Sequence, residues 1–374
     1  MLRSQCVRFG ARLRRASAAH RAAMLLSVVS NTASTSMKPS VCVIYTGGTI
    51  GMLPAVDGYR PAHGLRERIV AEIPRLSGAD MPLIEFVDFD QLIDSANAHP
   101  SHWNTIAEMI IERYDLFVGF VVLHGTDTMA YTASALSFML QGLGKPVILT
   151  GSQIPLCEIR NDARDNLIAS VLIAARGDIP EVCVCFGRHL LRGNRTVKAN
   201  AFGLDAFDSP NCLPLADIGT GVRVHGERLL ASPGKPMSLQ VLGASVVTTL
   251  RLFPGISVDA TRNALDDPVR GAVLECYGAG TGPGEDDALM AVFAQATERG
   301  VVIVAVTQCL TGSVTLATYA AGSALARAGV IGGRDMSTEA ALTKLRYLLD
   351  SGLAPAAVRE MIARDLRGEL TEEG

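Results

Sequence analysis

Short apolar runs alternate with amphipathic stretches over the first half of the chain. Four runs have the length and composition of buried strands, at residues 41–45, 117–123, 147–149 and 182–186. Apolar residues spaced three and four apart predict a helix with Ser101 as its N-cap, and another over about 128–141 that ends at Gly142 and Gly144. This alternation predicts a parallel sheet covered by helices on both faces.

The pattern weakens and then resumes in the second half. Around residues 224–236 the chain is polar, aperiodic and broken by glycine and proline, as in a linker. Further strands are predicted at 244–250, 272–276 and 301–306, and helices at 285–299 and 337–349. We therefore predict an α/β fold, in which a larger N-terminal domain with a parallel sheet is joined by a linker to a smaller α/β C-terminal domain. The predicted divisions are an extension at 1–38, a first domain at 39–225, a linker at 226–243 and a second domain at 244–374.

The N-terminal extension differs in composition from the rest of the chain. Its first 40 residues hold six arginines, one lysine and many serines and alanines, and the first acidic residue is Asp57. An arginine-rich start without acidic residues resembles a mitochondrial transit peptide, and an untargeted disordered extension fits the same composition. We expect a cytoplasmic protein, or a mitochondrial one if the extension is a transit peptide.

Composition and charge argue against several classes of protein. The chain of 374 residues is 48% hydrophobic and 19% charged, which is enough for a large buried core, and its net charge is −3. Beyond the extension it has no basic block, so we expect no nucleic-acid partner. Its apolar runs are far shorter than a membrane span, so we expect no membrane partner.

The eight cysteines favour a reducing compartment. Four of them lie in apolar runs and are expected to be small buried hydrophobic side chains: Cys42, Cys183, Cys185 and Cys276. Cys183 and Cys185 would share one face of a strand, but no second pair and no nearby histidine completes a zinc site. We therefore expect no metal.

Polar signatures follow each of the four predicted strands of the first half. They are Thr-Gly-Gly-Thr at 46–49, His-Gly-Thr-Asp-Thr at 124–128, Thr-Gly-Ser-Gln at 150–153 and Arg-Gly-Asn-Arg-Thr-Val-Lys at 192–198. Because ligands of open α/β sheets bind outside the carboxyl ends of strands, these residues are expected to converge on one rim. The pattern indicates a catalytic site built around threonine hydroxyls, with no histidine needed as its base.

Several of these residues also have structural interpretations. Thr49 fits a nucleophile on a sharp turn, a residue of an anion cradle or part of an ordinary turn, and the P-loop signature is absent. Asp127 could cap the helix that follows it. Lys198 could be a solvated surface lysine or, beside Asp127, complete a relay with Thr126. His124 fits a structural histidine better than a catalytic one.

Two further motifs are not expected to form a functional site. His99 and His102 flank a helix start without further ligand residues nearby, and we expect them on the surface. The glycines at 278–284 follow a strand, but their spacing is not Gly-x-Gly-x-x-Gly and the next helix opens with acidic residues. We expect no nucleotide there.

Together these motifs resemble the bacterial-type L-asparaginases, specifically their type I (cytosolic-type) group, over about residues 41–370. Residues 45–52 and 123–131 are similar to the two signatures of that family, and 144–155, 192–198 and 332–349 also match. The resemblance implies that Thr49 is the nucleophile and that Tyr59 helps to activate it. It implies a second triad of Thr126, Asp127 and Lys198. Asp94, Ser95, Thr126 and Asp127 would bind the substrate, and the Thr126 amide would contribute to the oxyanion hole.

The resemblance also implies an activity and an assembly. The activity would be hydrolysis of L-asparagine to L-aspartate and ammonia without a metal or organic cofactor, in a homotetramer of tight dimers or a homodimer. The alternatives are a glutaminase-asparaginase of mixed specificity, an amidotransferase subunit, which usually carries an additional N-terminal β-barrel, and a non-catalytic amino-acid-binding module. A non-catalytic module would be expected to have lost Thr49 or Lys198, and both are present.

Two positions depart from the family pattern. Thr281 stands where many members have an asparagine that reaches the partner subunit's substrate, and its shorter hydroxyl is expected to reach the substrate amino group less well. Glu275 stands where some type I members have an arginine near a second, effector asparagine. A carboxylate there would repel the effector's own carboxylate, which argues against regulation of that kind.

Overall fold

The computed structural model describes residues 38–316 and 319–372, and the chain from Pro39 onward belongs to one unit. The predictions for the extension at 1–38 therefore lie, apart from Lys38, outside the described residues. None of the described helices is long and apolar enough to cross a membrane.

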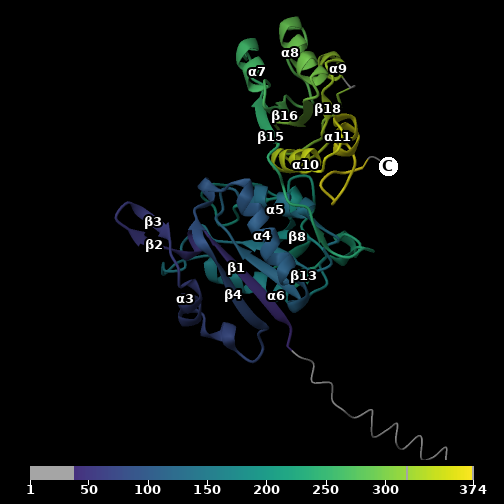
Figure 1. The fold of residues 1–374 in the computed structure, drawn as a ribbon. Coiled ribbons are helices and arrows are strands. Elements are labelled where there is room, and N and C mark those ends of the chain that lie inside the picture. The colour runs from purple at the N-terminus through teal and green to yellow at the C-terminus, as the bar shows by residue number, and fades with distance from the viewer. Residues whose placement is uncertain (1–37, 317–318, 373–374) are drawn as a thin grey trace, which may run out of the picture. The chain divides into compact units, whose positions relative to one another are not determined.

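An eight-stranded sheet organises the first part of this unit (Figure 1). Its spatial order is β13-β12-β9-β8-β7-β5-β1-β4. The strands are β1 (Ser40–Gly47), β4 (Leu83–Ile93), β5 (Gly119–Leu123), β7 (Val147–Thr150), β8 (Val182–Phe186), β9 (His189–Arg192), β12 (Ala216–Ile218) and β13 (Val222–Val224). The predicted strands β1, β5, β7 and β8 pair in parallel, and β4, which was not predicted, adds a parallel pair at the edge beside β1. Strands β9, β12 and β13, also not predicted, extend the other edge with antiparallel pairs.

Helices cover both faces of this sheet, which explains its uninterrupted apolar strands. The helices are α3 (Leu65–Glu72), α4 (Pro100–Glu112), α5 (Met129–Met139) and α6 (Ala163–Ala174). Alternate residues of β1 enter different cores: Cys42 and Ile44 pack with side chains of α4 and α5, whereas Val41 and Val43 pack with side chains of α3 and α6. The carboxyl ends of β1, β5 and β7 are thereby held at one rim.

A second sheet of four parallel strands, in the order β15-β16-β17-β18, organises the last third of the chain. Its strands are β15 (Val246–Arg251), β16 (Val269–Cys276), β17 (Val302–Thr307) and β18 (Ile331–Gly332), and its helices are α7 (Val258–Ala264), α8 (Asp287–Glu298), α9 (Ala320–Arg327), α10 (Thr338–Asp350) and α11 (Pro355–Ile362). Helix α10 packs on α5, where the hydroxyls of Thr343 and Ser134 lie 2.7 Å apart. The predicted fold class, with two separate sheets, is confirmed.

Short elements complete the fold. They are the hairpin of β2 (Met52–Ala55) and β3 (Gly58–Pro61), the pair β6 (Leu140–Gln141) and β14 (Ser238–Leu239), and the pair β10 (Val197–Lys198) and β11 (Phe207–Asp208). Because β14 pairs with β6, part of the stretch predicted as a linker is bonded to the end of α5. The exact divisions between the two domains stay a prediction.

One helix boundary was predicted wrongly. Helix α4 begins at Pro100 with His99, not Ser101, as its N-cap. The His99 ring accepts a bond from the Ser101 amide, and the His102 ring accepts one from the His99 amide. The two histidines therefore form a capping box, because they supply acceptors that the first amides of a helix otherwise lack.

A buried ion pair fixes the C-terminal tail to α10. Lys344 Nζ lies 2.5 Å from Glu369 Oε1, and both side chains are 0% exposed. Lys344 also donates to the carbonyls of Ile362 and Arg364, and Glu369 accepts from the amides of Leu366 and Arg367. Burial lowers the pKa of Lys344 and raises that of Glu369, because it penalises both charges.

Candidate active site

A double-glycine turn brings the end of β1 against two other chain segments. Gly47 and Gly48 have φ of 125° and 82°, values that other residues rarely adopt. A Cβ atom on Gly47 would lie 2.1 Å from the Ile93 carbonyl oxygen, and one on Gly48 would lie 2.3 Å from the Gly125 amide nitrogen. Thr49 follows directly as a half-buried residue that opens a short 3₁₀ helix. The turn therefore requires both glycines and places Thr49 beside the segment that holds Thr126.

The segment after β4 joins the same rim. Ser95 is buried, its hydroxyl accepts a 3.3 Å bond from the Asp127 amide, and its carbonyl accepts a 2.8 Å bond from the Thr128 hydroxyl. Asp94 is half-buried, and one of its carboxylate oxygens accepts from the Ala96 amide. Since the Ser95 hydroxyl is an acceptor in this bond, its own proton remains available to a ligand.

Thr126, Asp127 and Lys198 meet in one cluster. Lys198 Nζ lies 2.8 Å from the Thr126 hydroxyl and 2.7 Å from Asp127 Oδ1. The side chains of Lys198 and Asp127 are 20% and 60% exposed, so the cluster faces solvent at the carboxylate. Lys198 is held there by β10, where it pairs with Phe207 of β11. The interpretation of Lys198 as a free surface lysine is wrong.

Asp127 does not cap the helix that follows it. The N-cap of α5 is Thr128, and no side chain caps it. The carboxylate of Asp127 instead accepts a hydrogen bond from Lys198. The backbone N–H of Asp127 donates to the hydroxyl of Ser95. A carboxylate that bonds a cation and remains largely exposed is suited to a ligand with a positive charge.

His124 is a structural residue, as predicted. It is 1% exposed, and its Nδ1 lies 2.7 Å from the Gly125 carbonyl, which requires that this nitrogen carry the proton. Its Nε2 therefore accepts from the Thr132 hydroxyl at 3.0 Å, and Trp103 Nε1 donates to the same hydroxyl at 3.0 Å. Burial lowers the pKa of His124 to about 4, which keeps the ring neutral beside the site.

Tyr59 lies on the β2–β3 hairpin, and its hydroxyl forms a hydrogen bond with a residue other than Thr49. Its hydroxyl donates to Glu158 Oε1, and within the described residues no hydrogen bond joins Tyr59 to Thr49. The bond to Glu158 raises the pKa of the Tyr59 hydroxyl. No sequence motif singled out Glu158, since it is one of several charged residues in the loop after β7.

Gln153, within the signature after β7, is also part of the rim. The Thr126 hydroxyl lies 3.1 Å from its Oε1. The backbone N–H of Gln153 donates to the carboxylate of the buried Asp162 at 2.9 Å. The sequence placed Gln153 at the rim but gave it no individual role.

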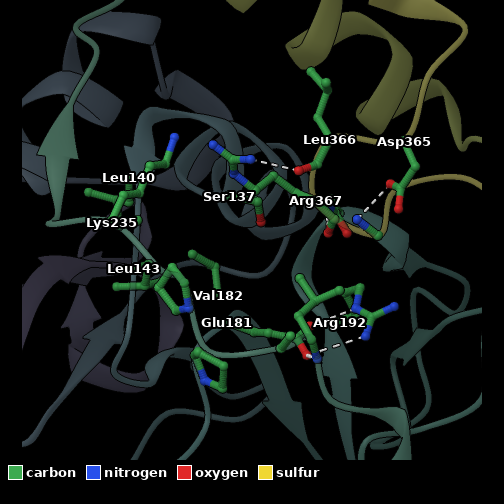
Figure 2. Close-up of a pocket in the computed structure, with 17 residues that line it drawn as sticks. Ser137, Leu140, Leu143, Glu181, Val182, Arg192, Lys235, Asp365, Leu366 and Arg367 are labelled. Carbon is green, nitrogen blue, oxygen red and sulfur yellow. Dashed lines mark hydrogen bonds and ion pairs between the residues drawn. The ribbon is translucent and has the colours of Figure 1, made fainter.

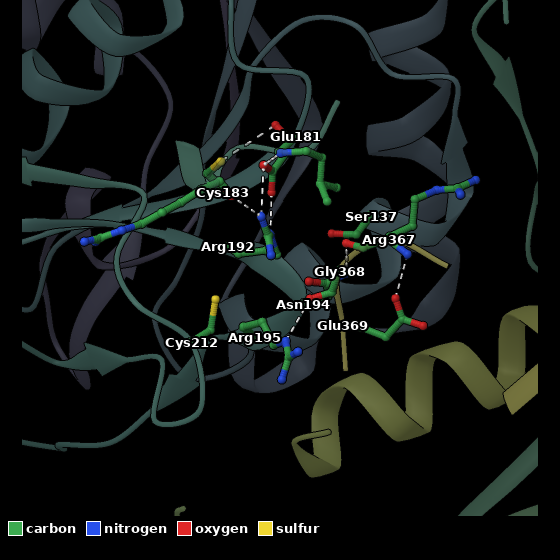
Figure 3. A network of polar contacts seen from close by, with 12 residues as sticks. Ser137, Glu181, Cys183, Arg192, Asn194, Arg195, Cys212, Arg367, Gly368 and Glu369 are labelled. Carbon is green, nitrogen blue, oxygen red and sulfur yellow. Dashed lines mark hydrogen bonds and ion pairs between the residues drawn. The ribbon is translucent and has the colours of Figure 1, made fainter. Parts of the chain in front are cut away.

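The side chains of the signature at 192–198 do not all reach the threonine cluster, and Figure 3 shows the separate polar network that Arg192, Asn194 and Arg195 join. Arg192 pairs with the buried Glu181 at 2.6 Å, and Arg195 pairs with Asp335 at 2.8 Å. Asn194 and Arg195 also donate to carbonyls of the C-terminal tail, at Arg367 and Gly368. Of the charged residues in this signature, only Lys198 reaches the threonine cluster, because the chain turns in a 3₁₀ helix at 193–195.

Two of the cavities formed by the described residues have similar volumes. One of about 240 Å³ is lined by the end of α5, the start of β8 and the tail at 365–368, and it contains none of the predicted site residues (Figure 2). Another of about 270 Å³ is lined on one side by Lys198 and on the other by Arg251 and Glu275. Arg251 lies 2.7 Å from Glu275, so the negative charge on which the argument against an effector rested is partly compensated.

The cysteines predicted to be buried and the possible metal ligands lie in several parts of the described chain. Cys42, Cys183, Cys185 and Cys276 are buried, as predicted. Burial raises the pKa of the Cys42 thiol to about 12, so it stays protonated. Among residues 38–316 and 319–372, no three His, Cys, Asp or Glu side chains are arranged to hold a metal ion.

The two sheets and a rim of threonine hydroxyls beside a lysine–aspartate pair define an α/β protein with a polar candidate site at the ends of its strands. Family models match most of the chain: "Asparaginase, N-terminal" at residues 40–230 and "Glutaminase/Asparaginase C-terminal domain" at 246–362. The chain belongs to the asparaginase family.

Individual relatives are similar over nearly the whole described chain. L-asparaginase 1 of Escherichia coli K12 is 47% identical over 344 residues, which cover 90% of this chain and 99% of that protein. The 60 kDa lysophospholipase of Mus musculus is 42% identical, over 88% of this chain and 62% of that protein. The crystal structure of L-asparaginase I from Vibrio cholerae has a TM-score of 0.83 and 41% identity, over 90% of this chain and all of that one.

Proposed function

We propose that this protein is an L-asparaginase that hydrolyses L-asparagine to L-aspartate and ammonia. The observation that carries the proposal is the cluster of Thr126, Asp127 and Lys198 beside the double-glycine turn of Thr49. The 47% identity to an L-asparaginase over 90% of the chain supports it.

The reaction would proceed in two steps. Thr49 Oγ attacks the side-chain amide carbon of asparagine, and its proton passes to the departing nitrogen, which leaves as ammonia. Water then attacks the Thr49 ester, restores the hydroxyl and releases aspartate. The backbone amide of Thr126 would stabilise the oxyanion. The positive charge of Lys198 would stabilise negative charge on Thr126 and Asp127 during the reaction. Tyr59 would assist Thr49 only after its hairpin moves and its hydroxyl leaves Glu158.

The substrate's α-groups would be bound at the opposite end of the rim. The exposed Asp127 carboxylate and Asp94 would bind the ammonium group, and the free proton of the Ser95 hydroxyl would bind the carboxylate. This clamp fixes the α-carbon at a set distance from Thr49. An added methylene in glutamine would displace the amide, and a misplacement of about 1 Å costs on the order of a hundredfold in rate.

Ammonia release from asparagine and glutamine, measured side by side on the wild type and Thr49→Ala, tests the proposal. We expect a strong preference for asparagine and a loss of more than about a thousandfold in Thr49→Ala. Comparable kcat/KM for the two amides would favour a glutaminase-asparaginase, and no ammonia from either would favour a binding module. Near-normal turnover in Thr49→Ala would move the nucleophile, with Thr126 the next candidate.

The remaining expectations belong to the same proposal. We propose a homotetramer or homodimer without a metal or organic cofactor, in the cytoplasm unless residues 1–38 direct the protein to mitochondria. Light scattering during size-exclusion chromatography measures the assembly. Fusion of residues 1–38 to a fluorescent reporter tests targeting, and a diffuse signal would remove the transit-peptide interpretation.

A further inference from the structure

A cavity of about 220 Å³ adjoins the cavity drawn in Figure 2. Lys235, Leu366 and Arg367 line both cavities, and Figure 2 shows the charged ends of Lys235 and Arg367 on the same side of the first one. We call it the α10 cavity, since Tyr347 and Leu348 of α10 belong to its wall. Its other lining residues come from α5, β6, α11 and the segment after α10: Phe138, Gln141, Ser351, Leu353 and Met361.

Two cations line the α10 cavity, and within the described residues neither forms an ion pair. Arg367 Nη1 donates to the Leu366 carbonyl at 2.6 Å, and most of its five N–H groups have no partner in the described chain. Lys235 is exposed, and its ammonium group bonds no described residue. No acidic residue lines this cavity. A cavity lined by charges of one sign attracts ions of the opposite sign, so these two cations favour an anionic ligand.

The acidic residues nearby belong to the neighbouring cavity of Figure 2, and both have partners. Glu181 pairs with Arg192 at 2.6 Å and accepts from the Leu230 amide. Asp365 accepts from the Gly368 amide at 2.7 Å. These bonds hold the two carboxylates to chain segments that do not line the α10 cavity. The positive charge of the α10 cavity is therefore not compensated by an ion pair within the described chain.

The Tyr347 hydroxyl adds a hydrogen-bond donor to the α10 cavity. Gln240 Nε2 donates to the Tyr347 carbonyl, which fixes this amide and turns its Oε1 toward Gln141. The Gln141 nitrogen therefore donates to Gln240 and, at 3.0 Å, to the Tyr347 hydroxyl. An amide N–H cannot accept, so the hydroxyl proton of Tyr347 points elsewhere, and no described residue accepts it. Since Tyr347 is 9% exposed, a buried donor remains for a ligand.

The α10 cavity has a charged side and an apolar side. Burial raises the pKa of the Tyr347 hydroxyl, and the positive charge of Arg367 opposes this rise, so the two groups lie within electrostatic range of each other. The Phe138 and Tyr347 rings have centroids 5.8 Å apart and form an apolar wall with Leu348 and Met361. A dry cavity of roughly 150 Å³ holds a benzene ring. The α10 cavity therefore has room for one ring-sized apolar group beside its charged side.

We propose that the α10 cavity binds a small carboxylate with an apolar body, such as an arylacetate. The carboxylate would accept from Lys235, from the planar guanidinium of Arg367 and from the Tyr347 hydroxyl. The apolar body would pack on Phe138 and Met361. None of the threonine-cluster residues lines this cavity, so the inference goes beyond the proposed function and its test needs no ammonia release.

Three probes separate the two halves of the proposed ligand. Isothermal titration calorimetry on the wild type measures binding of phenylacetate, of 2-phenylethanol, which has the ring without the charge, and of acetate, which has the charge without the ring. Phenylacetate should bind at one site per chain and at least about tenfold more tightly than the other two. Equal binding of 2-phenylethanol would indicate a merely apolar cavity, and equal binding of acetate a general anion site. Either result, or no saturable binding of phenylacetate, overturns the proposal.

Arg367→Met and Tyr347→Phe test the assigned residues. Arg367→Met should weaken phenylacetate binding on the order of tenfold, and Tyr347→Phe, which removes only the hydroxyl, by about threefold to tenfold. Arg364→Met is the matched control, because it removes the same charge from an exposed residue that pairs with Glu360 and does not line the cavity. Phenylacetate should raise the melting temperature of Arg364→Met as in the wild type, and that of Arg367→Met far less. Equal weakening in Arg364→Met would contradict the proposal.

Lys198→Met separates the α10 cavity from the catalytic cluster, since Lys198 is a second cation that a carboxylate could reach. The affinity for phenylacetate should be unchanged in this variant. Lost binding in Lys198→Met with retained binding in Arg367→Met would place the probe at the threonine cluster and overturn the proposal. Because the readout is binding, a wild type that releases no ammonia would refute the proposed function and leave this inference standing.

Discussion

Two lysine–carboxylate pairs of this protein have similar lengths and different surroundings. Lys198 lies 2.7 Å from Asp127, and Lys344 lies 2.5 Å from Glu369. The first pair leaves its carboxylate 60% exposed and adds a threonine hydroxyl, whereas the second is 0% exposed and adds backbone carbonyls and amides. The contact between the charges is thus similar, and the pairs differ in their exposure and in their remaining partners.

The difference separates a pair suited to chemistry from one suited to fixing the chain. Backbone amides and carbonyls satisfy the remaining bonds of Lys344 and Glu369, so this pair has no place for a ligand. An exposed pair adds little to stability, whereas removal of one partner from a buried pair leaves an uncompensated charge. Replacing the lysine of each pair should therefore affect turnover for the first pair and stability for the second.

Lys198→Met should produce the largest effect, on turnover. Loss of the cation leaves Asp127 and Thr126 without their shared partner, and kcat should fall on the order of a hundredfold to ten-thousandfold. The free energy of unfolding should change by less than about 1 kcal/mol, because the pair is partly exposed. Steady-state kinetics and urea unfolding measure the two. A large loss of stability with a modest loss of rate would make Lys198–Asp127 a structural pair.

Lys344→Met should have the opposite profile. It leaves the Glu369 carboxylate buried without its cation, which typically costs about 3–5 kcal/mol. Urea unfolding measures this loss, and kcat of the remaining folded enzyme should stay near the wild-type value. If kcat fell as far as in Lys198→Met, the tail would be coupled to the catalytic cluster and the separation of the two pairs would be wrong.

Acid pH should destabilise the core beside the first pair through His124. Its pKa is about 4 in the folded protein and about 6.5 when unfolded, so the unfolded state binds more protons between these values. The stabilisation is complete above about pH 6.5 and is lost as pH falls toward 4, by about 1.4 kcal/mol per pH unit at most. Unfolding free energies at pH 7.5 and 5 should differ by up to about 2 kcal/mol.

His124→Asn is the comparison for this pH effect. Asparagine does not titrate, so the variant should lose less stability than the wild type over the same pH range, even if it starts from a lower value. An equal pH slope in both proteins would assign the acid sensitivity to other groups.

Lys344→Met combined with Glu369→Met measures the coupling between the two charges of the buried pair. Without either charge, the desolvation penalty disappears, and the double variant should be more stable than the sum of the two single losses by about 1–3 kcal/mol. A double-mutant cycle by urea unfolding, with Glu369→Met alone, gives this coupling energy. Additive losses would mean that the two charges do not interact appreciably.

The sequence alone determined the central parallel strands β1, β5, β7 and β8 and the position of the rim, but not β4, β9, β12 or β13. The apolar runs at 41–45 and 182–186 predicted β1 and β8 because a parallel strand buried on both faces must be apolar throughout. The glycines at 47 and 48 marked the turn, since only a residue without a side chain fits so close to two backbones. The family signatures located Thr49, Thr126 and Lys198 at strand ends.

The tertiary structure decided what each polar side chain bonds. Thr126 and Lys198 are 72 positions apart, and Arg195 is 140 positions from Asp335, so no local period encodes either contact. The same limit explains why Asp127 suggested a helix cap and why Gln153 carried no role of its own. Local pattern reports which residues are buried, whereas the partner of a polar group depends on which distant segment the packed sheets bring to it.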